Sequence, residues 1–434
     1  MKIGVISLGC PKNLTDTEVI LGKLASAGFG ITAKVKEADV IIINTCAFIK
    51  GAKEEAIDTI LDIAGGRQKD QLLIVAGCLA QRYKKELPPL FPQVDGWIGS
   101  GSIDKIVEFV RSLTKSHKRG KVEVSKEGSC LFDHKTPRIK ATPPWYAYVK
   151  IADGCDNRCS YCAVPIIRGR FKSRPIESIV KEVKSLANRG VKEVIFVAHD
   201  TTMYGKGKLP LLLKKVSKID GIEWIRIMYA HPAHVTDKLL EIIANEPKIC
   251  KYLDLPIQHI CDRILNLMGR GVSKKDIKHL ITKIRRSIPG IILRTSLIVG
   301  FPTESEEDFE ELLNFVKETR FERLGVFTYS KEEGTGAAKL RGMVPERIKK
   351  SRYGKVMQAQ RHISKELNQK MIGKTLEILV ENQTQKGCLG RSYMDAPEID
   401  GSVLVRNSKI SPGEIAKARI TSASSYDLVG RYVT

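Results

Sequence analysis

Residues 153–162 read DGCDNRCSYC, and this stretch decides the kind of core that the chain must build. Its cysteines, Cys155, Cys159 and Cys162, follow the spacing C-x3-C-x2-C on one tight loop. Cysteine thiolates hold iron–sulfur clusters, usually four to a cluster. Three thiolates on a four-iron cluster leave one iron open to bind a substrate, which is typical of a catalytic cluster. Residues 148–151 resemble a strand, so the loop follows a strand's carboxyl end.

Two other interpretations of these cysteines are a zinc site and buried free thiols. Zinc sites usually combine two C-x2-4-C units or add histidines. The sequence offers no second unit of that kind near the loop. The spacing therefore favours an iron–sulfur cluster.

Composition limits the class of protein and its partners. The chain has 434 residues, enough for two to four domains, and its ten cysteines lack the short, even spacing of a secreted disulfide scaffold. It opens on an apolar strand rather than a signal peptide, and it has no apolar run of membrane-spanning length. We therefore expect a cytoplasmic protein. The net charge of +23 points to a polyanionic partner such as nucleic acid or a ribonucleoprotein, unless the surface is simply lysine-rich.

The alternation of apolar strands and amphipathic helices predicts four segments: an N-terminal domain (1–112), a linker (113–144), a core (145–368) and a C-terminal domain (369–434). Strands are expected at 3–7, 39–44 and 72–76, then at 146–151, 193–198, 224–229, 252–257, 292–299 and 323–329, and finally at 376–380, 403–405 and 418–420. The fold class is α/β, with an open parallel sheet first. Six core strands are too few for a closed eight-fold barrel and predict a partial (β/α)6 barrel. The last strands, separated by Gly and Pro turns, predict a small antiparallel β-barrel.

Helices are expected at 15–27, 176–188, 275–287, 305–319 and 346–368. Thr15, with Glu18 three residues later, has the pattern of a capping box for the first of them.

A second set of cysteines shares one structural position in the N-terminal domain. Cys10, Cys46 and Cys78 each follow an apolar strand, in the turn that leads toward the next helix. In an open α/β sheet those turns share the carboxyl edge, where ligands bind. The three thiols can therefore converge and hold a second cluster with an open iron, although buried free cysteines are also common.

The motifs around both cysteine sets resemble the radical S-adenosylmethionine (SAM) methylthiotransferases. The similar stretches are LGCPKN at 8–13, NTCAF at 44–48, AGC at 76–78, the Cys155 loop with Tyr161 before its third cysteine, LIVGFP at 297–302 and DAPEIDG at 395–401. The last resembles the small barrel called TRAM. LGCPKN is typical of the ribosomal-protein branch (RimO), whereas the tRNA branch (MiaB) usually carries GCQxN. Two stretches depart mildly from the RimO pattern, LTDTE at 14–18 and YAHP at 229–232.

The resemblance implies an enzyme that inserts a methylthio group at the β-carbon of an aspartate in a small-subunit ribosomal protein. Two [4Fe–4S] clusters and SAM are the implied cofactors. Cys155, Cys159 and Cys162 would hold the cluster that cleaves SAM to a radical, and Cys10, Cys46 and Cys78 the cluster that carries the sulfur. A separate SAM would donate the methyl group. Tyr161, Arg294, Gly300 and Asp200 are candidate SAM contacts, with a surface ion pair and simple turn use as the alternatives for Arg294 and Gly300.

The expected partners follow from the same resemblance. They are the ribosomal protein, in or near the ribosomal particle, a reductant and a sulfur donor, with contact to RNA left open and a monomer expected. Residues 369–434 hold nine Lys/Arg and seven Asp/Glu, a net charge of +2, which favours a protein target over tRNA. The alternatives are a tRNA methylthiotransferase acting on a hypermodified adenosine and a non-enzymatic iron–sulfur electron carrier. An electron carrier would normally supply four cysteines per cluster.

Overall fold

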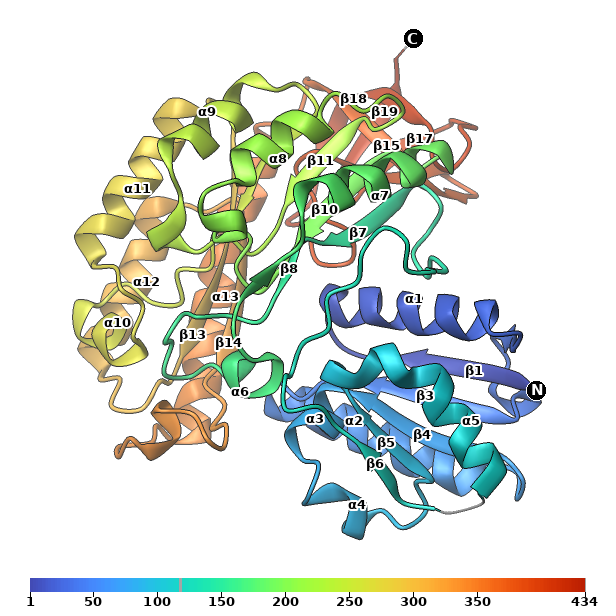
Figure 1. Cartoon of the computed structure of the whole chain (residues 1–434). Helices are drawn as coiled ribbons and strands as arrows, with labels where there is room; N and C mark the ends of the chain where they lie inside the picture. Colours follow the sequence, from blue (N-terminus) through green and yellow to red (C-terminus); the bar gives the residue numbers. More distant parts are fainter. Residues whose placement is uncertain (117–118, 434) are drawn as a thin grey trace.

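The computed structural model describes residues 1–116 and 119–433. Figure 1 shows three parts: an N-terminal α/β unit, a central sheet covered by helices, and a small barrel at the end of the core away from the N-terminal unit. This is the fold class that the sequence predicts.

The N-terminal unit is a sheet of six parallel strands in the order β2-β1-β3-β4-β5-β6. The strands are β1 (Lys2–Ser7), β2 (Gly30–Thr32), β3 (Val40–Thr45), β4 (Leu72–Gly77), β5 (Gly96–Gly99) and β6 (Lys121–Glu123). The helices around them are α1 (Pro11–Ser26), α2 (Lys50–Gly66), α3 (Cys78–Arg82), α4 (Leu87–Leu90) and α5 (Ile106–Ser116). Strand β3 is buried along its whole length, as expected for a parallel strand with both faces covered. The sheet extends beyond residue 112, because β6 lies in the segment predicted as linker.

Helix α1 begins four residues earlier than predicted. Pro11 occupies its first turn, where a missing N–H costs no hydrogen bond, and Cys10 is the extended residue before it. Thr15 therefore lies inside the helix, and its hydroxyl donates to the Lys12 carbonyl oxygen at 2.7 Å. The Glu18 carboxylate accepts from the Arg138 Nε at 2.7 Å instead of capping the helix. The predicted capping box is wrong, and the true helix start brings Cys10 and Lys12 to the edge of the sheet.

The core is an open sheet of six parallel strands in the order β14-β13-β12-β11-β10-β7. The strands are β7 (Tyr146–Lys150), β10 (Glu193–Val197), β11 (Trp224–Ile227), β12 (Ile249–Asp254), β13 (Ile292–Val299) and β14 (Arg323–Thr328). Each predicted strand is present, although β12 begins and ends three residues early. The edge strands β7 and β14 do not pair, so the barrel is partial, as predicted.

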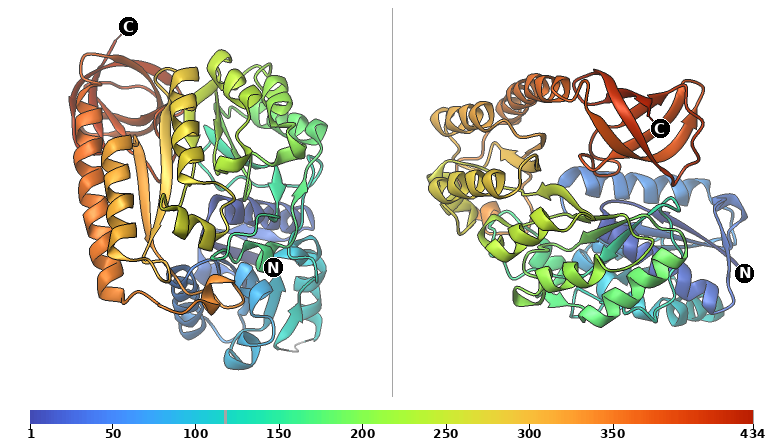
Figure 2. Two further views of the ribbon diagram at one scale, coloured as in Figure 1. Left: turned by 90° about the vertical axis from the view of Figure 1, so that its left-hand side faces the viewer. Right: turned by 90° about the horizontal axis from the view of Figure 1, so that it is seen from above.

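Helices cover the outer face of this sheet and bury its main apolar cluster, from Ala147 to Ile363. They are α7 (Ile176–Asn188), α8 (Leu209–Val216), α9 (Asp237–Asn245), α10 (Asp262–Met268), α11 (Lys274–Ser287) and α12 (Glu306–Thr319). The long helix α13 (Glu346–Gln369) then runs along the edge of the core to the C-terminal barrel (Figure 2). The predicted helices of the core are confirmed to within about one residue at each end.

The C-terminal barrel closes in the order β15-β16-β17-β19-β18. Its strands are β15 (Thr375–Thr384), β16 (Gly387–Ser392), β17 (Val403–Arg406), β18 (Ile415–Ala423) and β19 (Leu428–Tyr432). Its strand pairs are antiparallel except for β17 and β19, which run parallel. Two of these strands, β16 and β19, contain glycines and were not predicted.

The barrel docks on the inner face of the core sheet, where side chains of both parts form one apolar cluster. Buried polar pairs also cross this interface. Glu193 of β10 accepts from Arg391 of β16 at 2.8 Å. Arg323 of β14 donates to Asp395 at 2.6 Å, and the Tyr252 hydroxyl donates to Asp400 at 2.7 Å. The barrel therefore fills the side that an open sheet leaves uncovered.

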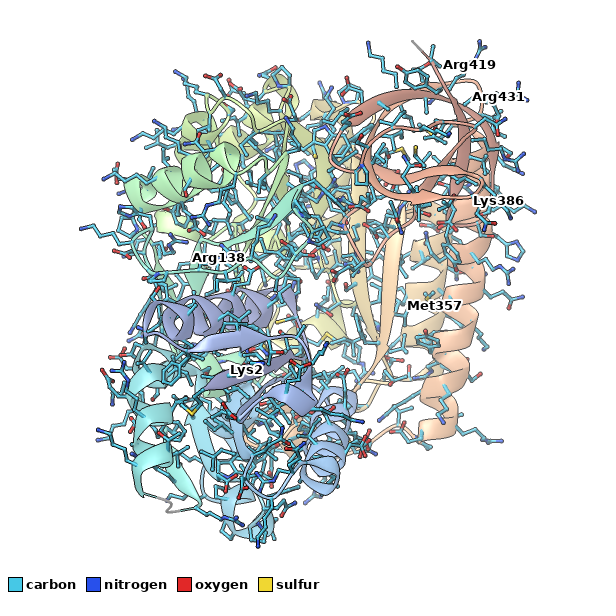
Figure 3. All side chains as sticks on the ribbon, turned by 90° about the vertical axis from the view of Figure 1, so that its right-hand side faces the viewer. Lys2, Arg138, Met357, Lys386, Arg419 and Arg431 are labelled. Carbon is cyan, nitrogen blue, oxygen red and sulfur yellow. The ribbon has the colours of Figure 1, made fainter. Side chains whose placement is uncertain are left out.

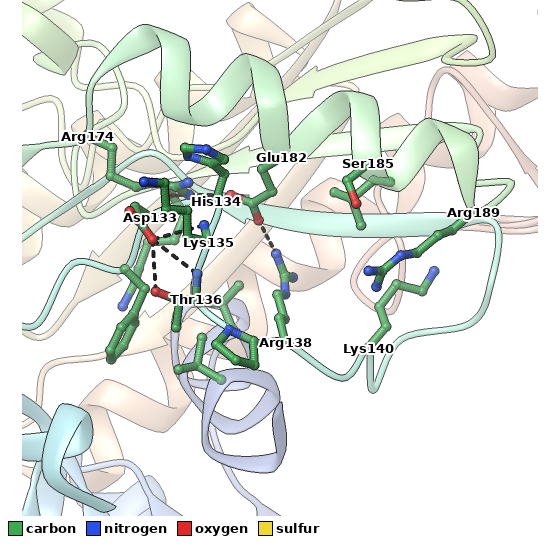
Figure 4. Close-up of a pocket in the computed structure, with 16 residues that line it drawn as sticks. Asp133, His134, Lys135, Thr136, Arg138, Lys140, Arg174, Glu182, Ser185 and Arg189 are labelled. Atoms are coloured by element: carbon green, nitrogen blue, oxygen red, sulfur yellow. Dashed lines mark hydrogen bonds and ion pairs between the residues drawn. The ribbon is translucent and has the colours of Figure 1, made fainter. Parts of the chain in front are cut away.

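The segment between β6 and β7 joins the N-terminal unit to the core. Arg138 of this segment contacts Glu18 of α1 and, at 2.5 Å, Glu182 of α7. A pocket of about 210 Å³ lies between the segment and these two helices (Figure 4). No cysteine lines this pocket, so it is separate from the cysteine sets.

Candidate active site with two cysteine triads

The N-terminal triad consists of Cys10, Cys46 and Cys78. These cysteines follow the carboxyl ends of β1, β3 and β4, which are neighbours in the sheet. Burial, together with the adjacent Cys78 and Cys10 thiols, raises the pKa of the Cys46 thiol to about 12. The structure therefore brings the three thiols together, as the turn positions predicted.

The turns of this triad are held by close backbone packing. Gly9 has a left-handed φ of +90°, and a Cβ there would lie 2.6 Å from the Cys46 Cβ. The Asn13 side-chain amide donates to the Leu8 carbonyl at 2.7 Å, and the Asn44 amide donates to the Asn13 carbonyl at 2.9 Å. The glycine and the two asparagines of the quoted motifs thus fix the turns that carry the thiols.

The core triad consists of Cys155, Cys159 and Cys162. It lies on the loop between β8 (Ala152–Asp153) and α6 (Val164–Arg168), beyond the carboxyl end of β7. Burial raises the pKa of the Cys162 thiol to about 12, and the Cys159 and Cys155 thiols add to that rise. The Ser160 amide donates to the Met268 carbonyl at 2.8 Å, which anchors the loop to α10.

The donor chemistry of the two triads fits an iron–sulfur cluster. Zinc binds sulfur at about 2.3 Å, which would place its thiolates roughly 4 Å apart. Within residues 1–116 and 119–433, only Asp200, His231 and His234 bring three ligand atoms within 4.8 Å of one another. Each cysteine triad is therefore wider than that, although its thiols still affect one another's pKa. Three thiolates in each set are the donors that an iron–sulfur cluster takes.

Each triad has a buried arginine that donates to one of its sulfurs. Arg168 Nη2 lies 3.2 Å from the Cys78 Sγ, and Arg270 Nη1 lies 3.4 Å from the Cys159 Sγ. Such donors stabilise a thiolate and the negative charge of a thiolate-bound cluster. The sequence analysis did not identify either arginine, because neither stands in a cysteine motif.

A buried charge network connects the two triads. Arg168 donates to Asp16 of α1 at 2.7 Å and to Asp153, two residues before Cys155, at 3.2 Å. Lys150 of β7 contacts the same two aspartates. Because Arg168 also contacts Cys78, this network fixes the N-terminal triad relative to the loop of the core triad.

Two of the predicted SAM contacts already have partners within the chain. Arg294 Nη1 donates to Asp254 at 2.9 Å, and Arg294 also lies 3.5 Å from Asp400 of the barrel, so its charge is already paired. Gly300 has a φ of +72°, and a Cβ there would lie 2.3 Å from the Cγ of Lys349 on α13. Packing against α13 accounts for this glycine without a cofactor.

Tyr161 and Asp200 lie beside the core triad. The Tyr161 hydroxyl is 3.3 Å from Arg270 Nη1. Asp200 follows β10 and accepts from the side-chain amide of Asn157, inside the cysteine loop, at 2.8 Å. His234 Nδ1 also lies 2.7 Å from Asp200, so this carboxylate braces the loop against the core.

Comparison with known proteins identifies the family. The family models that match are the Radical SAM superfamily at residues 149–316, Uncharacterized protein family UPF0004 at 2–99 and the TRAM domain at 372–433. The chain is 48% identical to "Ribosomal protein uS12 methylthiotransferase RimO" of Pelotomaculum thermopropionicum, over 100% of this chain and 99% of that protein. The chain belongs to the RimO family. The protein of the same name from Desulforamulus reducens is 49% identical, over 99% of this chain and 98% of that protein.

Solved structures share the fold of this RimO family member at low sequence identity. The radical S-adenosylmethionine methyltransferase TsrM from Kitasatospora setae, with cobalamin and a [4Fe-4S] cluster bound, matches with a TM-score of 0.57 and 14% identity, over 77% of this chain and 76% of TsrM. The cobalamin-dependent enzyme OxsB matches with a TM-score of 0.53 and 13% identity, over 84% of this chain and 56% of OxsB. None of the helices in the described part of the chain is long and apolar enough to cross a membrane.

Proposed function

We propose that this protein is a radical SAM methylthiotransferase that adds a methylthio group to the β-carbon of an aspartate in ribosomal protein uS12. The observation that carries the proposal is the pair of cysteine triads, each at the carboxyl edge of its own parallel sheet and joined through Arg168. The full-length identity to uS12 methylthiotransferases supports the choice of substrate.

The cofactors follow from the donor sets. Cys155, Cys159 and Cys162 would hold one [4Fe–4S] cluster, and Cys10, Cys46 and Cys78 the other, each with one iron free of protein ligands. Bound together with SAM, these groups supply the radical that removes hydrogen from an unactivated carbon, the sulfur that replaces it and the methyl group.

The residues around the triads bind and orient the thiols, and they exclude water from the site. Burial raises the pKa of the Cys46 and Cys162 thiols, so both are protonated at neutral pH without metal and must release their protons when a cluster is assembled. Arg168 and Arg270 then stabilise the thiolates by donating to sulfur. The Asn157–Asp200 hydrogen bond holds the core loop in place. A rigid surround of this kind keeps reactive groups at fixed positions.

The barrel supports contact with the RNA of the ribosomal particle. Its net charge is only +2, but two of its acids, Asp395 and Asp400, are paired with core residues and do not offset the charge of its outer face. Its outer face is basic: Arg406 lies opposite Arg431, which lies opposite Arg419 on the next strand. Figure 3 shows Arg419, Arg431 and Lys386 on the side of the barrel away from the core. Like charges directly opposite one another are unfavourable unless an anion binds them.

The experiment that tests this function offers reconstituted enzyme both candidate substrates. Purified protein with both clusters, SAM, a reductant and a sulfur source would be incubated with uS12 and with a tRNA that carries the hypermodified adenosine. Mass spectrometry should find the methylthio group on one aspartate of uS12 and none on the tRNA. Modification of the tRNA alone would contradict the proposed substrate.

A further inference from the structure

Lys12 lies between the two halves of the site, and its role is not explained by the clusters. It stands two residues after Cys10, in the first turn of α1, and is only 7% exposed. Its ammonium lies 3.3 Å from the centroid of the Tyr229 ring, which belongs to the core. Lys12 therefore places a positive charge between the N-terminal triad and the core.

The surroundings of Lys12 belong to the edge of the core sheet where ligands bind. Tyr229 follows β11, and Asp254 ends β12, so both lie at the carboxyl ends of parallel strands, as the Cys155 loop does. The Tyr229 ring contacts Lys12, which stands two residues after Cys10, and so lies near the N-terminal triad. Lys12 and Tyr229 thus flank the space that both triads share.

No carboxylate of the described residues lies within 4.0 Å of the Lys12 ammonium. Asp254 is occupied by Arg294 Nη1 at 2.9 Å and by the Tyr229 amide at 2.9 Å. Asp16 is occupied by Lys150 and Arg168. A buried ammonium whose direct contact is an aromatic ring rather than a carboxylate can still bind an anion that reaches it. An anion that arrives with the substrate would complete the site.

The backbone conformation of Tyr229 is unusual and holds its ring in a fixed position. Its φ is +63°, a conformation that is uncommon for a bulky residue. Hydrogen bonds to Asp254 and from Thr201 hold it there. Strain of this kind concentrates at functional sites.

We propose that Lys12 binds the side-chain carboxylate of the substrate aspartate. This inference rests on the function proposed above and identifies how that substrate is recognised. The β-carbon that receives the methylthio group is bonded directly to the carboxylate carbon. Anchoring the carboxylate at Lys12 therefore holds the β-carbon beside the Cys10 triad, and it selects aspartate over asparagine, which has the same shape but no charge.

The test compares uS12 carrying its aspartate with uS12 carrying asparagine at that position. Affinity for each would be measured by calorimetry on cluster-loaded wild-type, Lys12→Met, Lys12→Gln and Lys12→Arg enzymes, with Lys34→Met as the control. Lys34 lies in the same domain with a side chain that is 77% exposed. Iron content and melting temperature would confirm that the variants are folded.

Wild-type enzyme and the Lys34→Met control should bind the aspartate form about 10- to 100-fold more tightly, the range for a hydrogen bond to a charged group. Lys12→Met and Lys12→Gln should bind both forms with nearly equal affinity, and Lys12→Arg should keep most of the preference. The proposal is overturned if wild-type enzyme shows no preference, or if the neutral variants keep it or lose affinity equally for both forms. A wild-type enzyme that neither binds nor modifies uS12 would instead contradict the proposed function, and this assignment with it.

Discussion

Glu193 is a buried carboxylate that two arginines from different parts of the chain share. Arg226 Nε donates to it from the core at 2.7 Å, and Arg391 donates to it from the barrel at 2.8 Å. Burial alone would raise the pKa of Glu193, but Arg391 and Arg226 outweigh that effect and hold the pKa below its ordinary value. The ionised carboxylate is therefore part of what fixes the barrel to the core.

Glu193→Gln should destabilise the protein by about 3–5 kcal/mol at pH 7, because it leaves the buried Arg226 without its carboxylate partner and Arg391 with Glu381 as its remaining one. The depressed pKa means that the stabilisation is present above the ordinary pKa of 4.5 and is lost as pH falls through the lower folded-state pKa. The melting temperatures of the wild-type and Glu193→Gln proteins should therefore differ most near neutral pH and become similar in acid.

The matched control is Glu177→Gln, because that side chain is 71% exposed and forms a surface ion pair with Lys215. It should leave the melting temperature nearly unchanged. An equally stable Glu193→Gln protein would show that the buried cluster does not secure the barrel.

The sequence predicted the six cysteines of the candidate site but not the residues around them. Loop spacing and turn position are local properties, so Cys155 and Cys10 stand out without a structure. Arg168 and Arg270 act through contacts with residues far away in the sequence. The local sequence around a buried arginine does not distinguish it from an arginine on the surface. The importance of Lys12 likewise depends on Tyr229, a residue that lies 217 positions away in the sequence.

Among the elements, the core strands were predicted well, whereas the strands β2 and β6 and the helix α2 of the N-terminal unit were not predicted. β2 and β6 have three residues each, and their mostly exposed side chains give no apolar signal. The start of α1 was misplaced because Thr15 and Glu18 match a capping pattern that Pro11 makes unnecessary. Local patterns identify an element, but packing decides where it begins.

The basic stripe on the barrel, defined by Arg406, Arg419 and Arg431, gives a prediction for three adjacent strands. Changing all three to Gln should weaken binding to the small ribosomal subunit. It should also reduce the slope of log affinity against log salt concentration by about 0.7–0.9 for each phosphate that the stripe no longer neutralises. Modification of isolated uS12 should be unaffected, because Arg419 and Arg431 of the stripe lie on the side of the barrel away from the core (Figure 3).

The control for the stripe removes three exposed charges elsewhere, with Lys214 and Lys215 of α8 and Lys218 just beyond it changed to Gln. This variant should keep the wild-type salt slope for ribosomal subunits. Equal slopes for both variants would indicate that the overall charge, rather than the barrel, attracts the particle.

At the scale of the whole molecule, two sheets place their catalytic edges against one another. The sequence predicted the carboxyl edges of both sheets, because the order of strands and helices determines them. It could not predict how the N-terminal unit sits on the core, since that arrangement depends on the Asp16, Lys150, Asp153 and Arg168 network. The central claim is that the two triads in this arrangement perform separate steps of one reaction.

The most direct test of that claim is SAM cleavage by the Cys10→Ala, Cys46→Ala, Cys78→Ala triple variant, measured beside uS12 modification. Wild-type protein should bind about eight irons and the variant about four, by the rule of four irons per cluster. The folded, reduced variant should still convert SAM to 5′-deoxyadenosine and should leave uS12 without a methylthio group. Loss of SAM cleavage in the folded variant, or methylthiolation of uS12 by it, would contradict the division of roles between the triads.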